Sequence, residues 1–281
     1  MPSGDRRDAV KAIVSAGQRE LVAELERLDG GGRFGRSGRT RLLENGDVFE
    51  RAFVSAAFSD EYSAAGLSVV LHPRNPYVPA FQAHFRYREA ADAWWFGGSV
   101  DLLPCYGFAS DATHFHRALK NYCDTLDPAF HAQAKRACDD RFRLPHRGEA
   151  RGIGGILFDD LCLPGPDGWR RAAAFTAAGI ATVAPAYFPI VRRRKDLPHG
   201  ERERQWQLYR RGRYVEFTLV HDAATAVQAD AEAILMALPP LVRWESEFTP
   251  EPGSAEAELA SFLVPRDWAG EAAFPDTRVV G

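Results

Sequence analysis

The sequence HPRNPYVPAFQAHFRYRE (residues 72–89) begins with a proline-rich corner and then alternates between polar and apolar side chains. Side chains along a β-strand point to opposite faces with a period of two. The alternation therefore predicts a strand with an apolar face for burial and a polar face formed by Gln82, His84 and Arg86.

Further strand-like segments lie on both sides of this stretch. Residues 93–102 (AWWFGGSVDL) follow after a short polar link, which favours an antiparallel pair. Other expected strands are 67–71, 152–161 and 213–222, and expected helices are 5–28, 111–123, 128–139, 168–184, 201–211 and 254–263. Strands in sequence followed by helices, without a strict βαβ rhythm, predict an α+β fold with a large antiparallel sheet. We expect a single domain over residues 1–281.

The composition is that of an ordinary globular protein. The chain has 281 residues, of which 46% are hydrophobic and 26% charged, and a net charge of −3. This charge gives no reason to expect nucleic acid or an anionic membrane as a partner. We expect no membrane span and no signal peptide. The four cysteines show no CxxC pairing and are expected to be reduced, so the predicted location is cytoplasmic.

Three of the eight histidines stand at element ends or in loops, where scaffolds often display functional groups. His72 ends a strand at the proline corner, His116 lies early in a helix, and His146 lies in a loop. From spacing alone they are either three separate hydrogen-bonded side chains or a cluster. His114 and His116 diverge by roughly 200° on a helix, so they are not expected to share one metal ion.

Asp159 and Asp160 end the glycine-rich strand 152–161. Adjacent strand residues point to opposite faces, which argues against a carboxylate pair acting on one glycosidic bond. In one interpretation an aspartate accepts hydrogen bonds from substrate N–H groups. In the other it caps a helix or loop, as aspartates at element ends often do.

Arginines are dense in residues 191–196 and 209–217. Such runs form solvated faces or interface salt bridges, and the functional alternative is carboxylate recognition by the planar guanidinium. Arg86 differs because it shares a face with Gln82 and His84. We therefore predict Arg86 as a carboxylate anchor.

Several long stretches together resemble the oxygen-dependent coproporphyrinogen III oxidases. They run in order across the chain: HPRNPYVP, WWFGGSVDL, YGF followed by DATHFHRALKNYC, CDDRF followed by HRGEARGIGGILFDDL, GERERQWQLYRRGRYVEF, EAILMALPPLVRWE and PRDW. The resemblance implies a large antiparallel sheet flanked by helices, a homodimer, and a cleft along one sheet face. It implies oxidative decarboxylation of propionate side chains to vinyl groups by O2, without flavin, heme or nicotinamide.

The resemblance also assigns residues. The family's cleft histidines fall on His72, His116 and His146, and its substrate-contacting serine falls on Ser68. Its strand arginine falls on Arg86. Its aspartate facing the substrate falls within Asp159–Asp160, so substrate contacts are expected from both positions and a catalytic role from Asp160.

Three departures from the family pattern shape the main hypothesis. Gln82 stands where the family has a proton-donating histidine, and His84 stands where it has asparagine. Glutamine cannot exchange a proton near neutral pH, so the family's acid–base step cannot run through residue 82. We expect Gln82 as a residue of the catalytic site, and His84 as the group for both catalysis and substrate binding. The segment after residue 217 is shorter than in the family and lacks its glycines and arginine, and the loop before His72 is also shortened.

These departures suggest an enzyme of this family diverged to a different, smaller carboxylate substrate. In this hypothesis His72, His116 and His146, completed by His84, bind a redox or divalent metal such as Fe, Cu or Mn that activates O2. One alternative is a genuine coproporphyrinogen III oxidase in which His84 takes over the proton role. The other is a non-catalytic protein that binds a tetrapyrrole or another anion.

Overall fold

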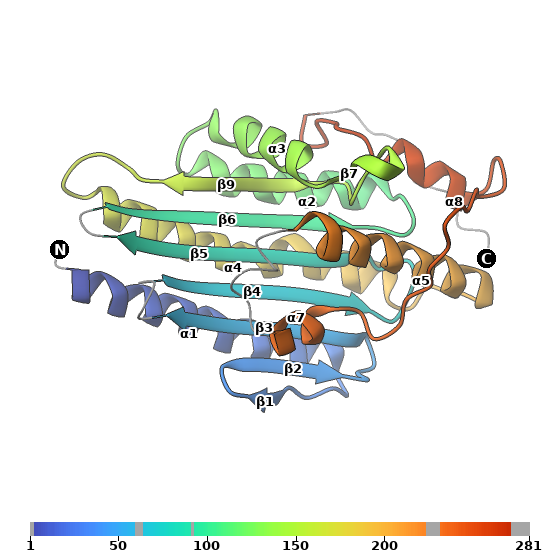
Figure 1. The fold of residues 1–281 in the computed structure, drawn as a ribbon, viewed down its shortest axis with the longest axis horizontal. Helices are drawn as coiled ribbons and strands as arrows, with labels where there is room; N and C mark the ends of the chain where they lie inside the picture. Colours follow the sequence, from blue (N-terminus) through green and yellow to red (C-terminus); the bar gives the residue numbers. More distant parts are fainter. Residues whose placement is uncertain (1–2, 60–63, 91–92, 223–230, 271–281) are drawn as a thin grey trace.

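The computed structural model describes residues 3–59, 64–90, 93–222 and 231–270 and contains a seven-stranded antiparallel sheet (Figure 1). The spatial order is β1-β2-β3-β4-β5-β6-β9, so six strands follow chain order and β9 pairs with β6. The strands are β1 (Gly35–Ser37), β2 (Thr40–Glu44), β3 (Phe49–Ser59), β4 (Ala64–Pro73), β5 (Ala80–Ala90), β6 (Ala93–Leu103) and β9 (Gly155–Leu161). A separate short hairpin consists of β7 (Arg143–Leu144) and β8 (Glu149–Ala150). The predicted α+β fold with an antiparallel sheet is confirmed.

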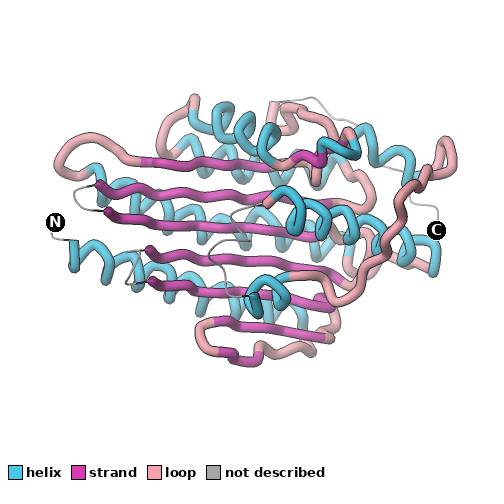
Figure 2. Tube along the Cα trace, in the orientation of Figure 1, coloured by secondary structure: helices cyan, strands magenta, loops and turns pink. Residues whose placement is uncertain are grey.

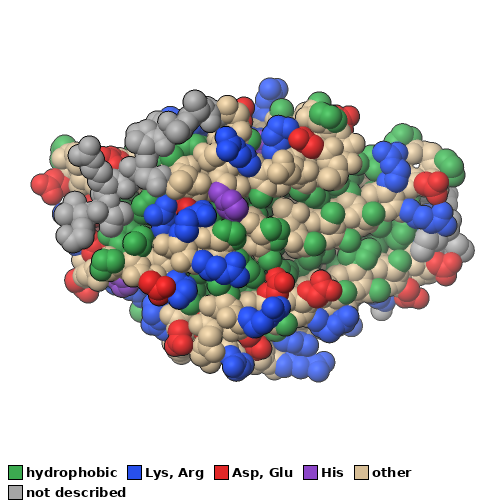
Figure 3. Space-filling view, turned by 180° about the vertical axis from the view of Figure 1, so that it is seen from behind, with side chains coloured by type: hydrophobic (Ala, Val, Ile, Leu, Met, Phe, Trp, Pro, Cys, Tyr) green, Lys and Arg blue, Asp and Glu red, His purple; other side chains and the backbone are tan. Residues whose placement is uncertain are grey.

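Helices cover both faces of this sheet (Figure 2). On the back lie α1 (Ser3–Asp29), α2 (Ala109–Asp124) and α4 (Gly168–Arg194), while α3 (Phe130–Arg141) packs along β9. On the front lie α5 (Glu201–Glu216) and α7 (Ala231–Ala237). The remaining short elements are η1 (Pro145–Arg147), η2 (Phe217–His221), α8 (Ala255–Glu258) and η3 (Leu259–Ser261). From behind, charged side chains of both signs are interspersed with apolar ones (Figure 3).

The alternation in β5 sets the two faces of the sheet as predicted. Phe81 and Phe85 are 1% exposed and point toward α4 on the back. The Phe81 and Tyr187 rings lie 4.9 Å apart, and a Cβ placed at Gly179 would come within 2.6 Å of the Phe85 ring. Glycine at this helix position therefore lets α4 lie directly against the sheet. The front face of β5 is left for polar side chains.

A single buried carboxylate connects the end of α1 to the start of β3. Asp29 accepts hydrogen bonds from the backbone N–H groups of Gly32, Asp47, Val48 and Phe49, at 2.6, 3.0, 2.9 and 2.9 Å. Its side chain thereby satisfies one amide in the loop after α1 and three amides in the β2–β3 turn and at the start of β3. The chain turns between β2 and β3 at Asn45–Gly46, and Asn45 has a φ of 57°.

Helix α4 corrects one expectation from the sequence. It extends ten residues beyond the predicted end at 184, and residues 172–191 contain no charged side chain. By length and composition alone α4 could cross a membrane, and the expectation of no membrane span stays a prediction. In the structure α4 packs behind the sheet, with Ala186, Tyr187 and Ile190 fully buried. Burial on a core helix selects the same apolar residues as a bilayer does.

The predicted strand at residues 213–222 was also wrong. These residues form the last turn of α5 and the π-helical turn η2. Their β-branched and aromatic residues pack because the helix presents Tyr214 and Val215 to a small cluster with Phe53 and Val70 on the sheet front. Tertiary burial has overridden local strand propensity here.

Candidate active site

A cleft of about 550 Å³ lies on the front face of the sheet. Its floor is formed by β3, β4 and β5, and its walls come from the β1–β2 hairpin, the end of α5 with η2, and α7. Its polar lining includes Ser68, Gln82, His84, Thr218 and Asp222. This volume lies within the roughly 300–1,000 Å³ range of small-molecule sites.

The floor carries a hydrogen-bonded row centred on His84. The register pairs Ser68 of β4 with His84 of β5, so both side chains rise from the same face. The Ser68 Oγ lies 2.9 Å from His84 Nδ1, and the Gln82 Nε2 lies 2.7 Å from His84 Nε2. Because the Gln82 amide N–H donates to Nε2, the imidazole proton is on Nδ1 and is donated to Ser68. The structure thus brings three of the predicted residues together.

The pKa of His84 is lowered to about 4, chiefly because burial disfavours the imidazolium. The Asp222 carboxylate across the cleft acts in the opposite direction, while the Arg151 and Arg86 guanidiniums lower the pKa further. His84 is therefore neutral at pH 7. In this form its ring can accept a proton, and Gln82 cannot.

Arg86 lies two residues beyond His84 on the same face and forms an ion pair with Asp159. The pair bridges from β5 to β9 across Gly97 of β6, which is the register partner of Arg86. A Cβ at Gly97 would lie 2.8 Å from both Arg86 Nε and Asp159 Oδ1. Only a residue without a side chain leaves room for this contact. The neighbouring Asp160 is exposed and has a left-handed φ of 55°.

Comparisons with known proteins give the family. The family model for coproporphyrinogen III oxidase matches residues 55–268. The oxygen-dependent coproporphyrinogen-III oxidase of Synechococcus sp. (strain CC9605) is 40% identical over 330 aligned residues, covering 98% of this chain and 91% of the relative.

This chain belongs to the coproporphyrinogen III oxidase family.

A second relative, the oxygen-dependent coproporphyrinogen-III oxidase of Parasynechococcus marenigrum (strain WH8102), shows the same identity and coverage. The alignments are longer than this chain, so these members of the coproporphyrinogen III oxidase family carry insertions relative to it. Parts of both segments predicted to be shortened, residues 60–63 and 223–230, lie outside the described residues.

The histidines that the family resemblance assigned to the cleft make separate contacts. His72 is 1% exposed, and its Nε2 lies 2.9 Å from the Ala237 carbonyl on the front face. Burial, Arg211 and Arg51 lower its pKa to about 3. His116 is fully buried behind the sheet on α2, with its Nε2 3.2 Å from the Ile153 carbonyl. Burial holds its pKa well below the usual value.

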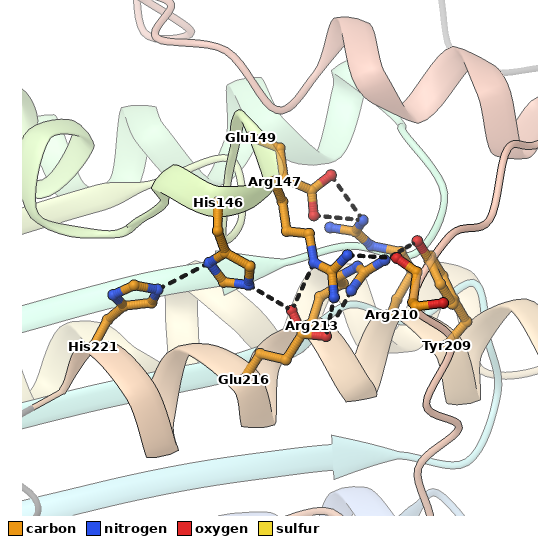
Figure 4. Close-up of polar contacts among 9 residues, drawn as sticks. His146, Arg147, Glu149, Tyr209, Arg210, Arg213, Glu216 and His221 are labelled. Carbon is orange, nitrogen blue, oxygen red and sulfur yellow. Dashed lines mark hydrogen bonds and ion pairs between the residues drawn. The ribbon is translucent and has the colours of Figure 1, made fainter.

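His146 lies on the short turn η1 and contacts the end of α5 instead (Figure 4). Its Nε2 lies 3.2 Å from Glu216 and its Nδ1 lies 3.1 Å from His221 Nε2. The expected site formed by His72, His116, His146 and His84 is therefore not present in the structure. The physical reason is that α2 packs behind the sheet, whereas α5 and the polar side chains of β5 lie on its front face. Within the described ranges, no group of three His, Cys, Asp or Glu side chains is placed to bind one metal.

The arginines of residues 209–217 are buried and paired with glutamates of the chain. Arg213 and Arg147 bind Glu216, and Arg210 binds Glu149, in the network of Figure 4. Each of the α5 arginines Arg210, Arg211 and Arg213 is at most 8% exposed. In the other block, Arg193 and Arg194 bind Asp111. The arginine runs thus connect α5 and α4 to their neighbours.

Sequence reasoning missed three polar residues near the site. Thr218 lies on η2, Asp222 follows directly after this turn, and both line the cleft. Reading residues 213–222 as a strand hid this relation. Asp101 of β6 is the register partner of Gln82 and is 1% exposed. Its Oδ2 binds Arg151, while its Oδ1 has no hydrogen-bond partner among the described residues.

Proposed function

We propose that this protein is a genuine coproporphyrinogen III oxidase, which oxidises coproporphyrinogen III with O2 and converts propionate side chains to vinyl groups. The observation that carries the proposal is the similarity to two enzymes named for this activity over 98% of the chain. The polar-floored cleft supports it. This reading replaces the diverged-substrate hypothesis as the main one.

The reaction balances with O2 as the only oxidant. A –CH2–CH2–COOH side chain and O2 give –CH=CH2, CO2 and H2O2. Two electrons leave the side chain and reduce O2, while the C–C bond to the carboxyl group breaks. A proton leaves the substrate as these electrons pass to O2, so a group in the cleft has to accept and return it.

His84 is the group that we assign to this proton transfer. It is neutral, and Ser68 fixes the orientation of its ring. The Nε2 lone pair accepts from the Gln82 amide in the empty cleft, so Gln82 has to release it before it can take a proton. Carboxylates of a bound substrate add negative charge near the imidazole, and nearby negative charge favours the protonated form. Substrate binding therefore raises the pKa of His84 from about 4 toward the range in which proton transfer is efficient.

A metal has no part in this proposal. The histidines proposed as ligands lie on opposite faces of the sheet, so the residues present do not fit the group and no step is derived through it. The homodimer and the cytoplasmic location implied by the resemblance stay predictions.

The test is an assay of the purified protein with coproporphyrinogen III and O2, read by mass spectrometry. We expect products that have lost one and two CO2, and we expect His84→Asn to lower kcat at least a hundredfold. His199→Asn, at an exposed histidine outside the cleft lining, is the matched control. If folded protein binds the substrate without converting it, the non-catalytic alternative stands. Absence of both binding and product would favour a different carboxylate substrate.

A further inference from the structure

The Arg86–Asp159 pair differs from an ordinary surface ion pair in how it is built. Its partners come from β5 and β9, which are not neighbours, and the strand between them contributes only a glycine. The contact over Gly97 is so close that even a methyl group would collide with both side chains. The sheet therefore provides a gap of defined width in which a carboxylate meets the Arg86 guanidinium.

The same pair is accessible from the front of the molecule. The Arg86 and Asp159 side chains are 40% and 48% exposed, and Arg86 shares its face with His84. Partial burial, followed by the charges of Arg88 and Arg141, lowers the pKa of Arg86, and Asp160 and Asp222 oppose this. Arg86 thus stands among charges of both signs beside the cleft, with its guanidinium already bound by a carboxylate of the chain.

We propose that Asp159 occupies Arg86 in the empty enzyme in place of a substrate carboxylate and is displaced when substrate binds. This inference rests on the proposed function, which supplies a substrate with several carboxylates. Exchange of one carboxylate for another keeps the charge-assisted hydrogen bonds of Arg86 nearly constant. A ligand without a carboxylate has no group to replace Asp159, so it leaves the pair intact. Asp159 therefore competes with substrate carboxylates for Arg86 and limits the affinity for them.

The direction in which substrate affinity changes when the Asp159 charge is removed separates this role from a positioning role. If Asp159 competes with substrate, removing its charge frees Arg86 and tightens binding. If Asp159 only orients Arg86, removing its charge loosens binding. Competition at a half-exposed pair corresponds to a few-fold change in affinity, because solvent screens such pairs.

The experiment measures binding of coproporphyrin III, the oxidised and fluorescent form of the substrate, by quenching of its fluorescence. We expect Asp159→Asn to bind it about three- to fivefold more tightly than wild type. Asp160→Asn removes the same charge at the next residue without freeing Arg86, and we expect a smaller change. In an Arg86→Gln background, Asp159→Asn should have no further effect. The tetramethyl ester, which lacks carboxylates, should not gain affinity in Asp159→Asn.

Other results overturn the inference. Weaker binding by Asp159→Asn would make Asp159 a positioning residue. An equal effect in the Arg86→Gln background would show that the aspartate acts without Arg86. Turnover of coproporphyrinogen III by wild type is measured in the same series. Turnover with an unchanged affinity in Asp159→Asn refutes this inference alone, whereas absence of both turnover and binding refutes the proposed function as well.

Discussion

Two arginine–aspartate pairs of this sheet show how burial changes the use of one interaction. Arg151 binds Asp101 Oδ2 through Nε and Nη2 at 3.1 and 2.7 Å, and both side chains are at most 2% exposed. The Arg151 guanidinium lies 4.0 and 4.6 Å from the ring centres of Phe142 and Phe217. Arg86 and Asp159 make the same kind of contact with nearly half of each side chain in solvent.

The difference shows that a ligand can replace one partner of an ion pair only where the pair is accessible to solvent. A buried pair has paid for desolvation of both charges, so losing one partner leaves the other charge uncompensated. A half-exposed pair can be replaced by water or by a ligand at small cost. The buried pair therefore fixes the sheet to the segment before β9, and the exposed pair is suited to binding.

The largest expected effect comes from breaking the buried pair. Asp101→Ala leaves the Arg151 charge buried and unpaired, and we expect a loss of about 3–5 kcal/mol in the free energy of unfolding. Chemical denaturation measures it. Asp159→Ala is the matched control at the exposed pair, and a loss of similar size there would contradict the comparison.

Burial also disfavours the charged form of a histidine, which predicts that the free energy of unfolding depends on pH. The pKa of His72 is about 3 in the folded protein and about 6.5 in the unfolded chain. Below pH 6.5 the unfolded state binds a proton that the folded state does not, so stability falls as the pH drops toward 3. At pH 5 this amounts to about 2 kcal/mol.

Denaturation between pH 7 and pH 5 checks this prediction. His72→Gln should show a shallower loss of stability with falling pH than wild type, whatever its stability at pH 7. His199→Gln, at an exposed histidine, should follow the wild-type slope. Parallel slopes for wild type and His72→Gln would show that the fold admits the charged imidazole.

Removing the Arg86 charge is expected to change the free energy of substrate binding by less than Asp101→Ala changes the free energy of unfolding. Arg86→Gln removes a charge-assisted hydrogen bond to a substrate carboxylate, worth about 1.5–3 kcal/mol. We expect KM for coproporphyrinogen III to rise tenfold or more while kcat changes little. Steady-state kinetics measure both constants. A fall in kcat at unchanged KM would place Arg86 in the chemical step.

The smallest expected effect is on stability at the exposed pair. Asp159→Asn should change the free energy of unfolding by less than about 1 kcal/mol, because solvent screens its contact with Arg86. Thermal or chemical denaturation tests it alongside the binding titration. A larger loss would mean that the pair supports the sheet, and would remove the contrast between the two pairs.

Much of the fold follows from short stretches of sequence. The alternation at residues 80–88 places Phe81 and Phe85 toward the helices and Gln82 and His84 toward the cleft, as found. Such a pattern is local, because one strand with one buried face determines it. The helical end of α5 could not be predicted in this way, since its burial depends on Phe53 and Val70, which are distant in sequence.

The site was only partly predictable for a related reason. The Ser68–His84 contact depends on neighbouring strands whose pairing the sequence indicates. The placement of His116 depends on which face of the sheet α2 covers, and no pattern within α2 encodes this. The Arg86–Asp159 pair needs β9 to join the sheet beside β6 and Gly97 to lie between them. Neither relation is visible before the topology is known.

The Asp29 carboxylate has a consequence for how the N-terminal part of the chain opens. Four amides from two separate segments share its two oxygens. Fraying of α1 at its last turn therefore exposes the first residues of β3 in the same event. We expect these amides to exchange with solvent deuterium at one common rate, as parts of a single cooperative unit. Helix and strand thus unfold together, and the β3 part of the cleft floor opens with them.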